Sequence, residues 1–166
     1  MKKLIIAAFI FAGIAVTHTA SAQLSVQINI GNQPAWGPVG YNYARYYYLP
    51  EINAYYDINA QRFMYMDRGR WITARHLPPA YGRINLYNTY KVVVNRNYVP
   101  YRDNRMDIVN YGKYKNTRSQ MAIRDSRDRK YFESKYHPQH NQWQKDARNN
   151  NRGRDLARNT SRGRGR

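Results

Sequence analysis

Residues 46–74 read YYYLPEINAYYDINAQRFMYMDRGRWITA, and this stretch decides the fold of the chain. It contains short runs of aromatic and β-favouring side chains, and turn-forming residues close each run. The four runs cover residues 46–49, 53–58, 62–66 and 70–74. Runs of this length and spacing predict an antiparallel β-meander.

The best defined turn in this stretch is Asp67-Arg68-Gly69, between the third and fourth runs. Glycine can take a positive φ there, as a tight hairpin requires. Strand alternation then places Phe63 and Tyr65 on one face of the sheet and Met64 and Met66 on the other. Because both faces are apolar, at least one of them must be covered.

Residues 23–100 are predicted to form one Tyr-rich β-meander domain. They hold twelve of the seventeen tyrosines, and the chain has no cysteine. The core must therefore be largely aromatic and cannot depend on disulfides. The candidate cover for the sheet is the region 81–98. Its segment 87–94 reads YNTYKVVV, which fits a helical turn leading into a strand, and the valine run favours the strand.

Residues 101–143 are predicted to be a helical extension, which makes the chain α+β overall. The expected helices cover residues 103–111 and 117–136. The second has a broken apolar stripe, so we expect it to dock loosely or to form only in part. It carries opposite charges four residues apart, at Arg124/Asp128, Asp125/Arg129 and Arg129/Glu133.

Residues 144–166 are predicted to be a disordered Arg/Asn/Gly-rich tail. They contain eight basic and two acidic side chains, one leucine and no aromatic residue, so they cannot form a core. The terminal Arg-Gly alternation is similar to segments that hold nucleic acid through phosphate contacts. A solvated tail that keeps the protein soluble is an equal alternative. The residues predicted to bind a polyanion are Arg148, Arg152, Arg154, Arg158, Arg162, Arg164 and Arg166.

Residues 1–22 have the pattern of a secretory signal peptide. Lys2 and Lys3 precede an apolar run over residues 4–16, and Ala20-Ser21-Ala22 fits the cleavage motif. The run is too short to span a bilayer and polar residues follow it, which disfavours an uncleaved anchor. Cleavage is predicted between Ala22 and Gln23. The mature protein would then be periplasmic or secreted and would keep no transmembrane segment.

The chain is strongly basic, with a formal net charge of +18 that falls to +16 when residues 1–22 are removed. The charge is uneven, because residues 23–100 carry a net +5 and residues 101–166 a net +11. Such a balance favours polyanions as partners, whether nucleic acid, anionic lipid or acidic polysaccharide. It does not choose among them, and the oligomeric state is left open.

No motif indicates an enzyme, because the chain lacks a Gly-rich phosphate loop, a nucleophile elbow and a paired-histidine zinc motif. Asp125, Ser126 and Asp128 lie beside basic residues and are interpreted as part of a solvated, ion-paired face. His137 and His140 could face one metal ion, but a third ligand is missing. We therefore predict no catalytic residue, no cofactor and no metal site.

The tyrosine clusters have two interpretations. Exposed aromatic rows can stack on sugar rings or nucleobases, and Tyr47 and Tyr55 are the candidate stacking residues. Alternatively the clusters are core and cross-strand pairs, since a small sheet without disulfides needs every large side chain. The sequence leaves both open and favours the core.

Several segments resemble a family of small, uncharacterised, exported, Tyr-rich proteins of Gram-negative bacteria. The resemblance extends to about His140, and it rests mainly on residues 36–38, 46–52, 55–57, 69–72, 77–78, 86–93, 123–126 and 130–132. It implies an envelope location and a small β-rich body, and it brings no activity or site residue.

From the whole sequence we expect a non-enzymatic, exported cell-envelope binding or structural protein that contacts anionic polymers or surfaces. One alternative is an extracytoplasmic nucleic-acid-binding module. Another is a carbohydrate-binding protein, or an enzyme, that uses an aromatic face.

Overall fold

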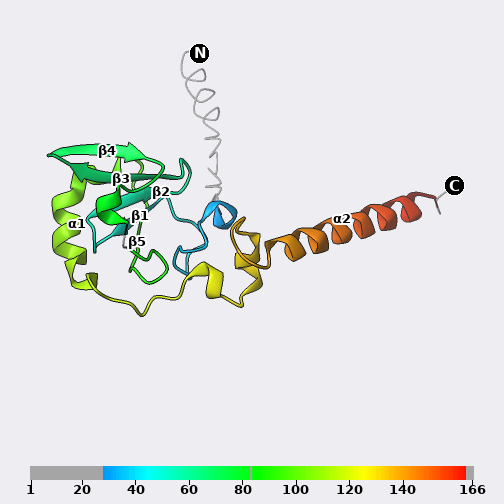
Figure 1. The fold of residues 1–166 in the computed structure, drawn as a ribbon. Coiled ribbons are helices and arrows are strands. Elements are labelled where there is room, and N and C mark those ends of the chain that lie inside the picture. The colour runs from blue at the N-terminus through cyan, green and yellow to red at the C-terminus, as the bar shows by residue number, and fades with distance from the viewer. Residues whose placement is uncertain (1–27, 83, 164–166) are drawn as a thin grey trace, which may run out of the picture.

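The computed structural model of the chain describes residues 28–82 and 84–163 (Figure 1). The predicted signal peptide, residues 1–22, and its cleavage site lie outside these residues. The described chain has the predicted α+β fold, with a five-stranded antiparallel sheet followed by helices. The strands are β1 (Tyr46–Leu49), β2 (Ala54–Asp57), β3 (Arg62–Asp67), β4 (Arg70–Ala74) and β5 (Val92–Val94), and their order in the sheet is β4-β3-β2-β1-β5.

The meander predicted for residues 46–74 is confirmed, because each run forms a strand and pairs with the next. The β3–β4 hairpin turns where predicted, but Asp67 belongs to β3 and pairs with Arg70, so the turn itself is the two residues Arg68 and Gly69. Arg68 and Gly69 both take positive φ, 47° and 77°. Two successive left-handed residues match the right-handed twist of the flanking strands.

Replacing Gly69 by valine should destabilise the protein by about 1–3 kcal/mol, because a β-branched residue is strained at φ 77°. Gly153→Val is the matched control: Gly153 is helical and exposed, and an added Cβ there meets no atom within 4 Å, as at Gly69. The two melting temperatures compare the variants directly. Equal temperatures would contradict the strain argument.

Each face of the sheet carries a core cluster, and the predicted alternation is confirmed for Phe63, Met64 and Tyr65, whereas Met66 is 37% exposed. Phe63 and Tyr65 lie in one core cluster, whereas Met64 lies in the other. The region 81–98 does more than cover the sheet, because it supplies β5, which pairs with β1 at the sheet edge. The first cluster is covered by side chains outside the strands, among them Trp36, Leu77, Tyr81 and Leu86. The second is covered by Trp71, Tyr101 and Tyr111.

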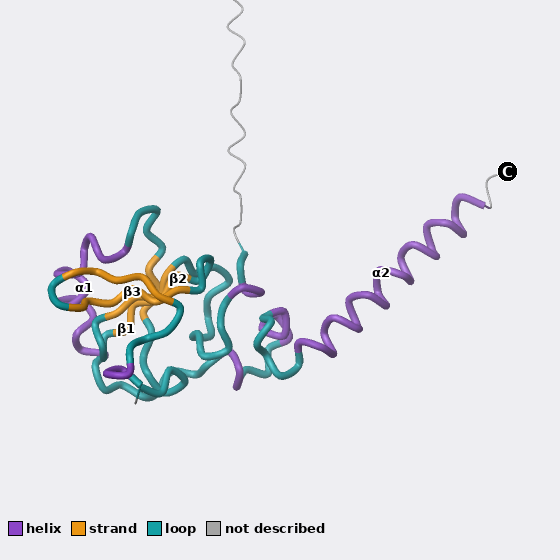
Figure 2. The backbone as a smooth tube through the Cα atoms, turned by 45° about the horizontal axis from the view of Figure 1, so that its top comes forward, coloured by secondary structure: helices purple, strands orange, loops and turns teal. Residues whose placement is uncertain are grey.

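The first predicted helix is confirmed as α1 (Asn104–Tyr111), preceded by a 3₁₀ turn over Pro100–Asp103. Tyr101, in the preceding 3₁₀ turn, and Tyr111, the last residue of α1, pack on the second core cluster, so α1 lies beside the sheet (Figures 1 and 2). Further 3₁₀ turns cover Ile30–Asn32, Pro79–Tyr81 and Gly112–Tyr114.

The helix predicted over 117–136 is wrong. Only the 3₁₀ turns Ile123–Asp125 and Arg129–Glu133 form there, joined by extended chain. The backbone instead pairs with residues 35–39, since Ile123 donates its N–H to the Gly37 carbonyl at 2.8 Å. This non-local pairing outweighs a weak helical propensity. The predicted ion pairs are replaced by Arg124–Asp125, Lys130–Asp128 and Arg129–Asp146.

The chain continues as α2 (His140–Gly163), a long helix that leads away from the body (Figure 1). Residues 144–163 are therefore helical where the sequence analysis expects a disordered tail. Glutamine, lysine, alanine and arginine favour helix, and Gln142 contacts Asp146 one turn on. Residues 144–154 are exposed or half-buried and join no core cluster, as their composition implies. Among residues 28–82 and 84–163, no helix is long and apolar enough to cross a membrane.

Candidate functional site

An aromatic cleft lies where the N-terminal segment meets β2. Its volume is about 170 Å³, and its lining is Pro34, Ala35, Trp36, Tyr56, Tyr87 and Tyr136. The Trp36 ring is held edge-on to Tyr56, with ring centres 4.8 Å apart, and parallel to Phe63 at 6.2 Å. Because the core fixes these rings, the cleft presents preformed aromatic surfaces.

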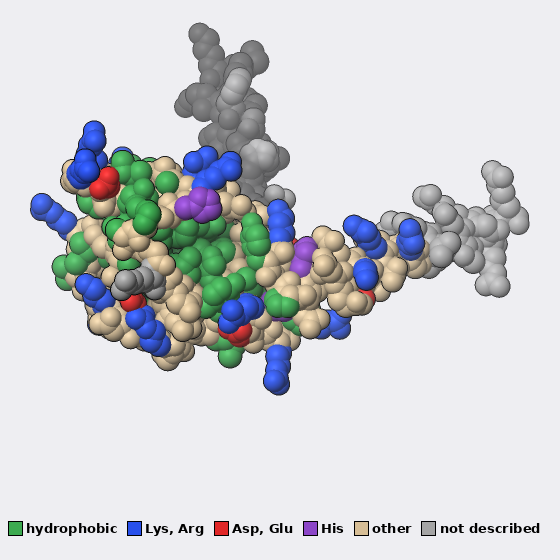
Figure 3. Space-filling view, in the orientation of Figure 1, with side chains coloured by type: hydrophobic (Ala, Val, Ile, Leu, Met, Phe, Trp, Pro, Cys, Tyr) green, Lys and Arg blue, Asp and Glu red, His purple; other side chains and the backbone are tan. Residues whose placement is uncertain are grey.

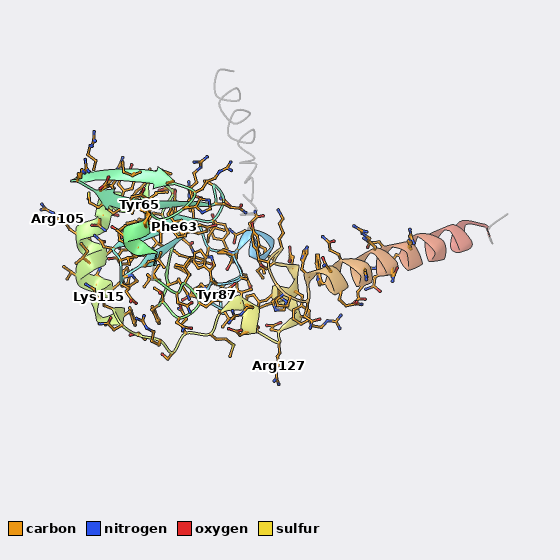
Figure 4. The ribbon with its side chains drawn as sticks, viewed as in Figure 1. Phe63, Tyr65, Tyr87, Arg105, Lys115 and Arg127 are labelled. Carbon is orange, nitrogen blue, oxygen red and sulfur yellow. The ribbon has the colours of Figure 1, made fainter. Side chains whose placement is uncertain are left out.

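Tyr87 and Tyr136 form the outer part of the aromatic cleft. The guanidinium of Arg124 lies 3.9 Å from the centre of the Tyr87 ring, which is a close cation–π contact. Tyr136 is 52% exposed, and its hydroxyl donates a long hydrogen bond, 3.4 Å, to Gln61. Figure 4 shows Tyr87 between the sheet and the chain that leads to α2.

A second, more polar hollow of about 460 Å³ adjoins the first and shares Tyr56 with it. Arg62, Arg75 and His76 line it, and all three are exposed. Phe63 pairs with Ala74, so continuing this register places Arg75 opposite Arg62. Like charges directly opposite one another are unfavourable, and a bound anion would relieve their repulsion.

Asp57 is the carboxylate nearest to these arginines in the strand pairing, since it opposes Arg62 from β2. Its Oδ1 accepts a hydrogen bond from the Ala60 N–H at 2.8 Å. Within the described chain no ion pair joins it to Arg62 or Arg75. The two guanidinium groups are therefore available to an anion from solvent.

The predicted polyanion-binding arginines lie beyond this cleft, on and after α2. Tyr136 precedes the first residue of the helix by four positions, so the cleft lies at the root of α2. Arg148, Arg152 and Arg154 are exposed, and none of them is in an ion pair within the described chain. Arg148 and Arg152 are one turn apart, which places them on one face. Arg158 and Arg162 belong to the helical backbone, whereas Arg164 and Arg166 lie outside the described residues.

The two predicted stacking residues are core residues. Tyr47 and Tyr55 are fully buried, so neither can stack on a ligand. The Tyr47 hydroxyl donates to Gln33 Oε1 at 2.8 Å, and the Tyr55 hydroxyl donates to Asp107 Oδ2 at 2.6 Å. Sequence reasoning missed Trp36 and Tyr136. The sequence signal that could have found Trp36 and Tyr136 is their position outside the predicted strands, because an aromatic ring that is not part of a strand core can line a cleft.

Two ionisable side chains, Asp107 and Lys91, are buried in the body. Asp107 is fully buried, and Arg96 donates to both of its oxygens at 2.6 Å. This carboxylate raises the pKa of the Arg96 guanidinium above its usual value. Lys91 is also fully buried, and its Nζ donates to the Leu86 carbonyl at 3.1 Å. Burial lowers the pKa of Lys91 to about 8.

The two neighbouring histidines are engaged within the protein. His137 Nδ1 accepts from the Gln139 N–H, and its Nε2 faces the Ser126 carbonyl at 3.3 Å. His140 Nδ1 lies 2.9 Å from the Phe132 carbonyl, and its Nε2 lies 2.9 Å from the Gln144 amide. In the part of the chain that the structure describes, no group of three His, Cys, Asp or Glu side chains could hold a metal ion.

Asp125, Ser126 and Asp128 are all engaged in local contacts. Asp125 pairs with Arg124, which lowers the pKa of its carboxyl. Ser126 is buried, and its Oγ accepts from the Asp128 N–H at 3.2 Å. Asp128 itself caps the following 3₁₀ turn through the Lys130 N–H. These contacts stabilise turns.

Comparisons of the chain with protein-family models, with curated proteins and with solved structures find no match.

Proposed function

We propose that this protein is an exported, non-enzymatic binding protein of the cell envelope that holds an anionic polymer in the aromatic cleft and along α2. Export is inferred from the signal-peptide pattern of residues 1–22. One observation carries the binding proposal. The rigid aromatic rings of the cleft lie next to Arg62 and Arg75, which make no ion pair within the described chain, and close to the start of the basic helix α2.

Each part of this surface has a separate task. Trp36 and Tyr136 offer ring faces to a flat sugar or base, a contact worth about 1–3 kcal/mol per base in single-strand binding. Arg62 and Arg75 bind the negative charge of the same sugar or nucleotide unit. Arginines of α2 extend the contact along the polymer, and they contribute chiefly by releasing its counterions.

Salt titrations of binding test this proposal, with an acidic polysaccharide and single-stranded DNA as probes. Tyr136→Ala should weaken binding about 5- to 150-fold, because it removes one stacking face. Tyr41→Ala is the control, since Tyr41 is also exposed but does not line the cleft. Fluorescence anisotropy of labelled probes gives both affinity and salt slope.

The charge contribution is measured separately with Arg75→Ser. The log–log salt slope should fall by about 0.7 for the single-stranded DNA probe. Arg127→Ser makes the same charge change at an exposed residue that points away from the body (Figure 4) and should leave the slope unchanged. Equal effects of the two substitutions would mean that net charge, not the cleft, attracts the polymer. If the protein binds DNA much more tightly than an acidic polysaccharide of the same charge density, the nucleic-acid-binding alternative is correct.

A further inference from the structure

Helix α1 turns polar side chains toward the body and apolar side chains toward solvent. Asp107 is fully buried, and Asn104 donates to Asn53 Oδ1 at 2.7 Å and to the Tyr55 hydroxyl at 3.1 Å. On the outer side, Met106 is 62% exposed and Val109 is 81% exposed. Ile108, 46% exposed, lies about 200° around the helix from Met106 and therefore flanks this side instead of belonging to it.

This arrangement is the reverse of a helix that covers a core. A surface helix normally buries its apolar stripe and exposes its charges. Here the polar inner side is accounted for by hydrogen bonds and the ion pair to Arg96, whereas the apolar outer side has no partner in the described structure. Clustered apolar groups rimmed by polar residues mark interaction surfaces.

The cations around α1 indicate the chemistry of the partner. Arg102 lies in the 3₁₀ turn before α1, Arg105 lies in its first turn, and Lys113 and Lys115 follow its end; all four are exposed. None of them is in an ion pair within the described residues, because Asp103 and Asp107 both pair with Arg96. Arg105 and Lys115 project outward on the side of α1 (Figure 4). The space-filling view has apolar atoms along this edge with basic groups on either side (Figure 3).

We propose that α1 docks the protein on an anionic lipid bilayer. Met106 and Val109, three residues apart on one face, enter the boundary between head groups and acyl chains, while Arg102, Arg105, Lys113 and Lys115 lie against lipid phosphates. Apolar insertion and basic attraction together are the combination that interfacial helices use. An eight-residue helix with two outward apolar side chains is too small for a stable protein interface, which buries more than about 1,000 Å².

The lipid surface is separate from the polymer site. α1 lies at the opposite end of the body from α2, so one molecule could hold a polymer while resting on a membrane (Figure 1). The inference does not depend on the proposed polymer binding, since it uses none of the cleft residues.

Cosedimentation with lipid vesicles tests the docking proposal. The full protein should bind vesicles of phosphatidylglycerol and phosphatidylcholine in equal amounts, and only weakly vesicles of phosphatidylcholine. The double variant Met106→Ser/Val109→Ser should bind the anionic vesicles at least about tenfold more weakly. Met121→Ser, which changes an apolar residue that is 56% exposed elsewhere, should bind like the unsubstituted protein. Arg105→Gln/Lys113→Gln should weaken binding by about fivefold per charge removed.

A fluorescent probe distinguishes insertion from attraction by α2. The chain has no cysteine, so Val109→Cys and Met121→Cys each provide one labelling position for an environment-sensitive dye. Dye at position 109 should shift to the blue on anionic vesicles, whereas dye at position 121 should not. Equal binding by the Met106→Ser/Val109→Ser variant, or no shift at position 109, would overturn the proposal. So would a self-association that this variant abolishes while vesicle binding persists.

Discussion

Arg96→Met should lower the free energy of unfolding by about 3–5 kcal/mol, because it leaves the buried Asp107 carboxylate without its charged partner. Arg96 donates to both oxygens of Asp107 at 2.6 Å and contacts Asp103 at 3.1 Å. After the substitution the Tyr55 hydroxyl is the one side-chain donor to this carboxylate that remains among the residues the structure describes. Since small domains are stable by about 5–15 kcal/mol, the loss would be a large share of the total.

Arg118→Met is the matched control for this prediction. Arg118 also makes a two-pronged pair, with Glu51, but its side chain is 48% exposed. A pair screened by water contributes at most about 1 kcal/mol. Urea unfolding curves give the free energy of unfolding of each variant, and the two values can be compared directly if both variants depend on urea concentration with the same slope. The double variant Arg96→Met/Asp107→Leu should recover much of the loss, because no charge is then buried alone. Similar losses for Arg96→Met and Arg118→Met would contradict the role given to the buried pair.

The protein should also unfold as the pH rises above about 10, the usual pKa of tyrosine. Burial raises the pKa of Tyr48 and of Tyr56 to about 12, and it raises the pKa of Tyr47 and Tyr55 as well. Above pH 10 the unfolded chain loses these protons while the folded chain keeps them. Stability therefore falls from about pH 10 to beyond pH 12, by on the order of 1–2 kcal/mol per buried tyrosine.

Lys91 has the opposite effect on the pH dependence of stability, and it does so at lower pH. Its pKa is lowered from 10.5 to about 8, so between these values the unfolded chain binds more protons than the folded chain. Stability should then rise from pH 8 toward pH 10 before the tyrosines reverse the trend. Urea midpoints across this range, with tyrosinate absorbance, follow both effects.

Single substitutions separate the two contributions to the pH profile. Lys91→Met should remove the rise. Tyr56→Phe should reduce the alkaline fall, whereas Tyr41→Phe at an exposed position should not. A stability that stays constant to pH 12 would contradict the burial of the tyrosine hydroxyls.

The sequence predicts the sheet well and the candidate site poorly. The strand runs, the turn at Gly69 and the alternation of Phe63 and Met64 depend on neighbours in the chain, so local patterns are sufficient to find them. Trp36 and Tyr136 are a hundred residues apart, and no local pattern brings them into one cleft. Tyr47 and Tyr55 are buried, and their hydroxyls bond to Gln33 and Asp107, which are distant in sequence.

The sequence by itself therefore determined the meander, its tightest turn, the first helix and the basic character of the chain, because backbone propensity, alternation and charge are properties of short segments. Only the tertiary structure decided that residues 117–136 pair with residues 35–39 instead of forming a helix. It also decided that α1 faces inward with Asp107 and outward with Val109. The physical reason is that Arg96, Tyr55 and the Gly37 carbonyl become partners only when distant parts of the chain meet, and such contacts outweigh weak local preferences.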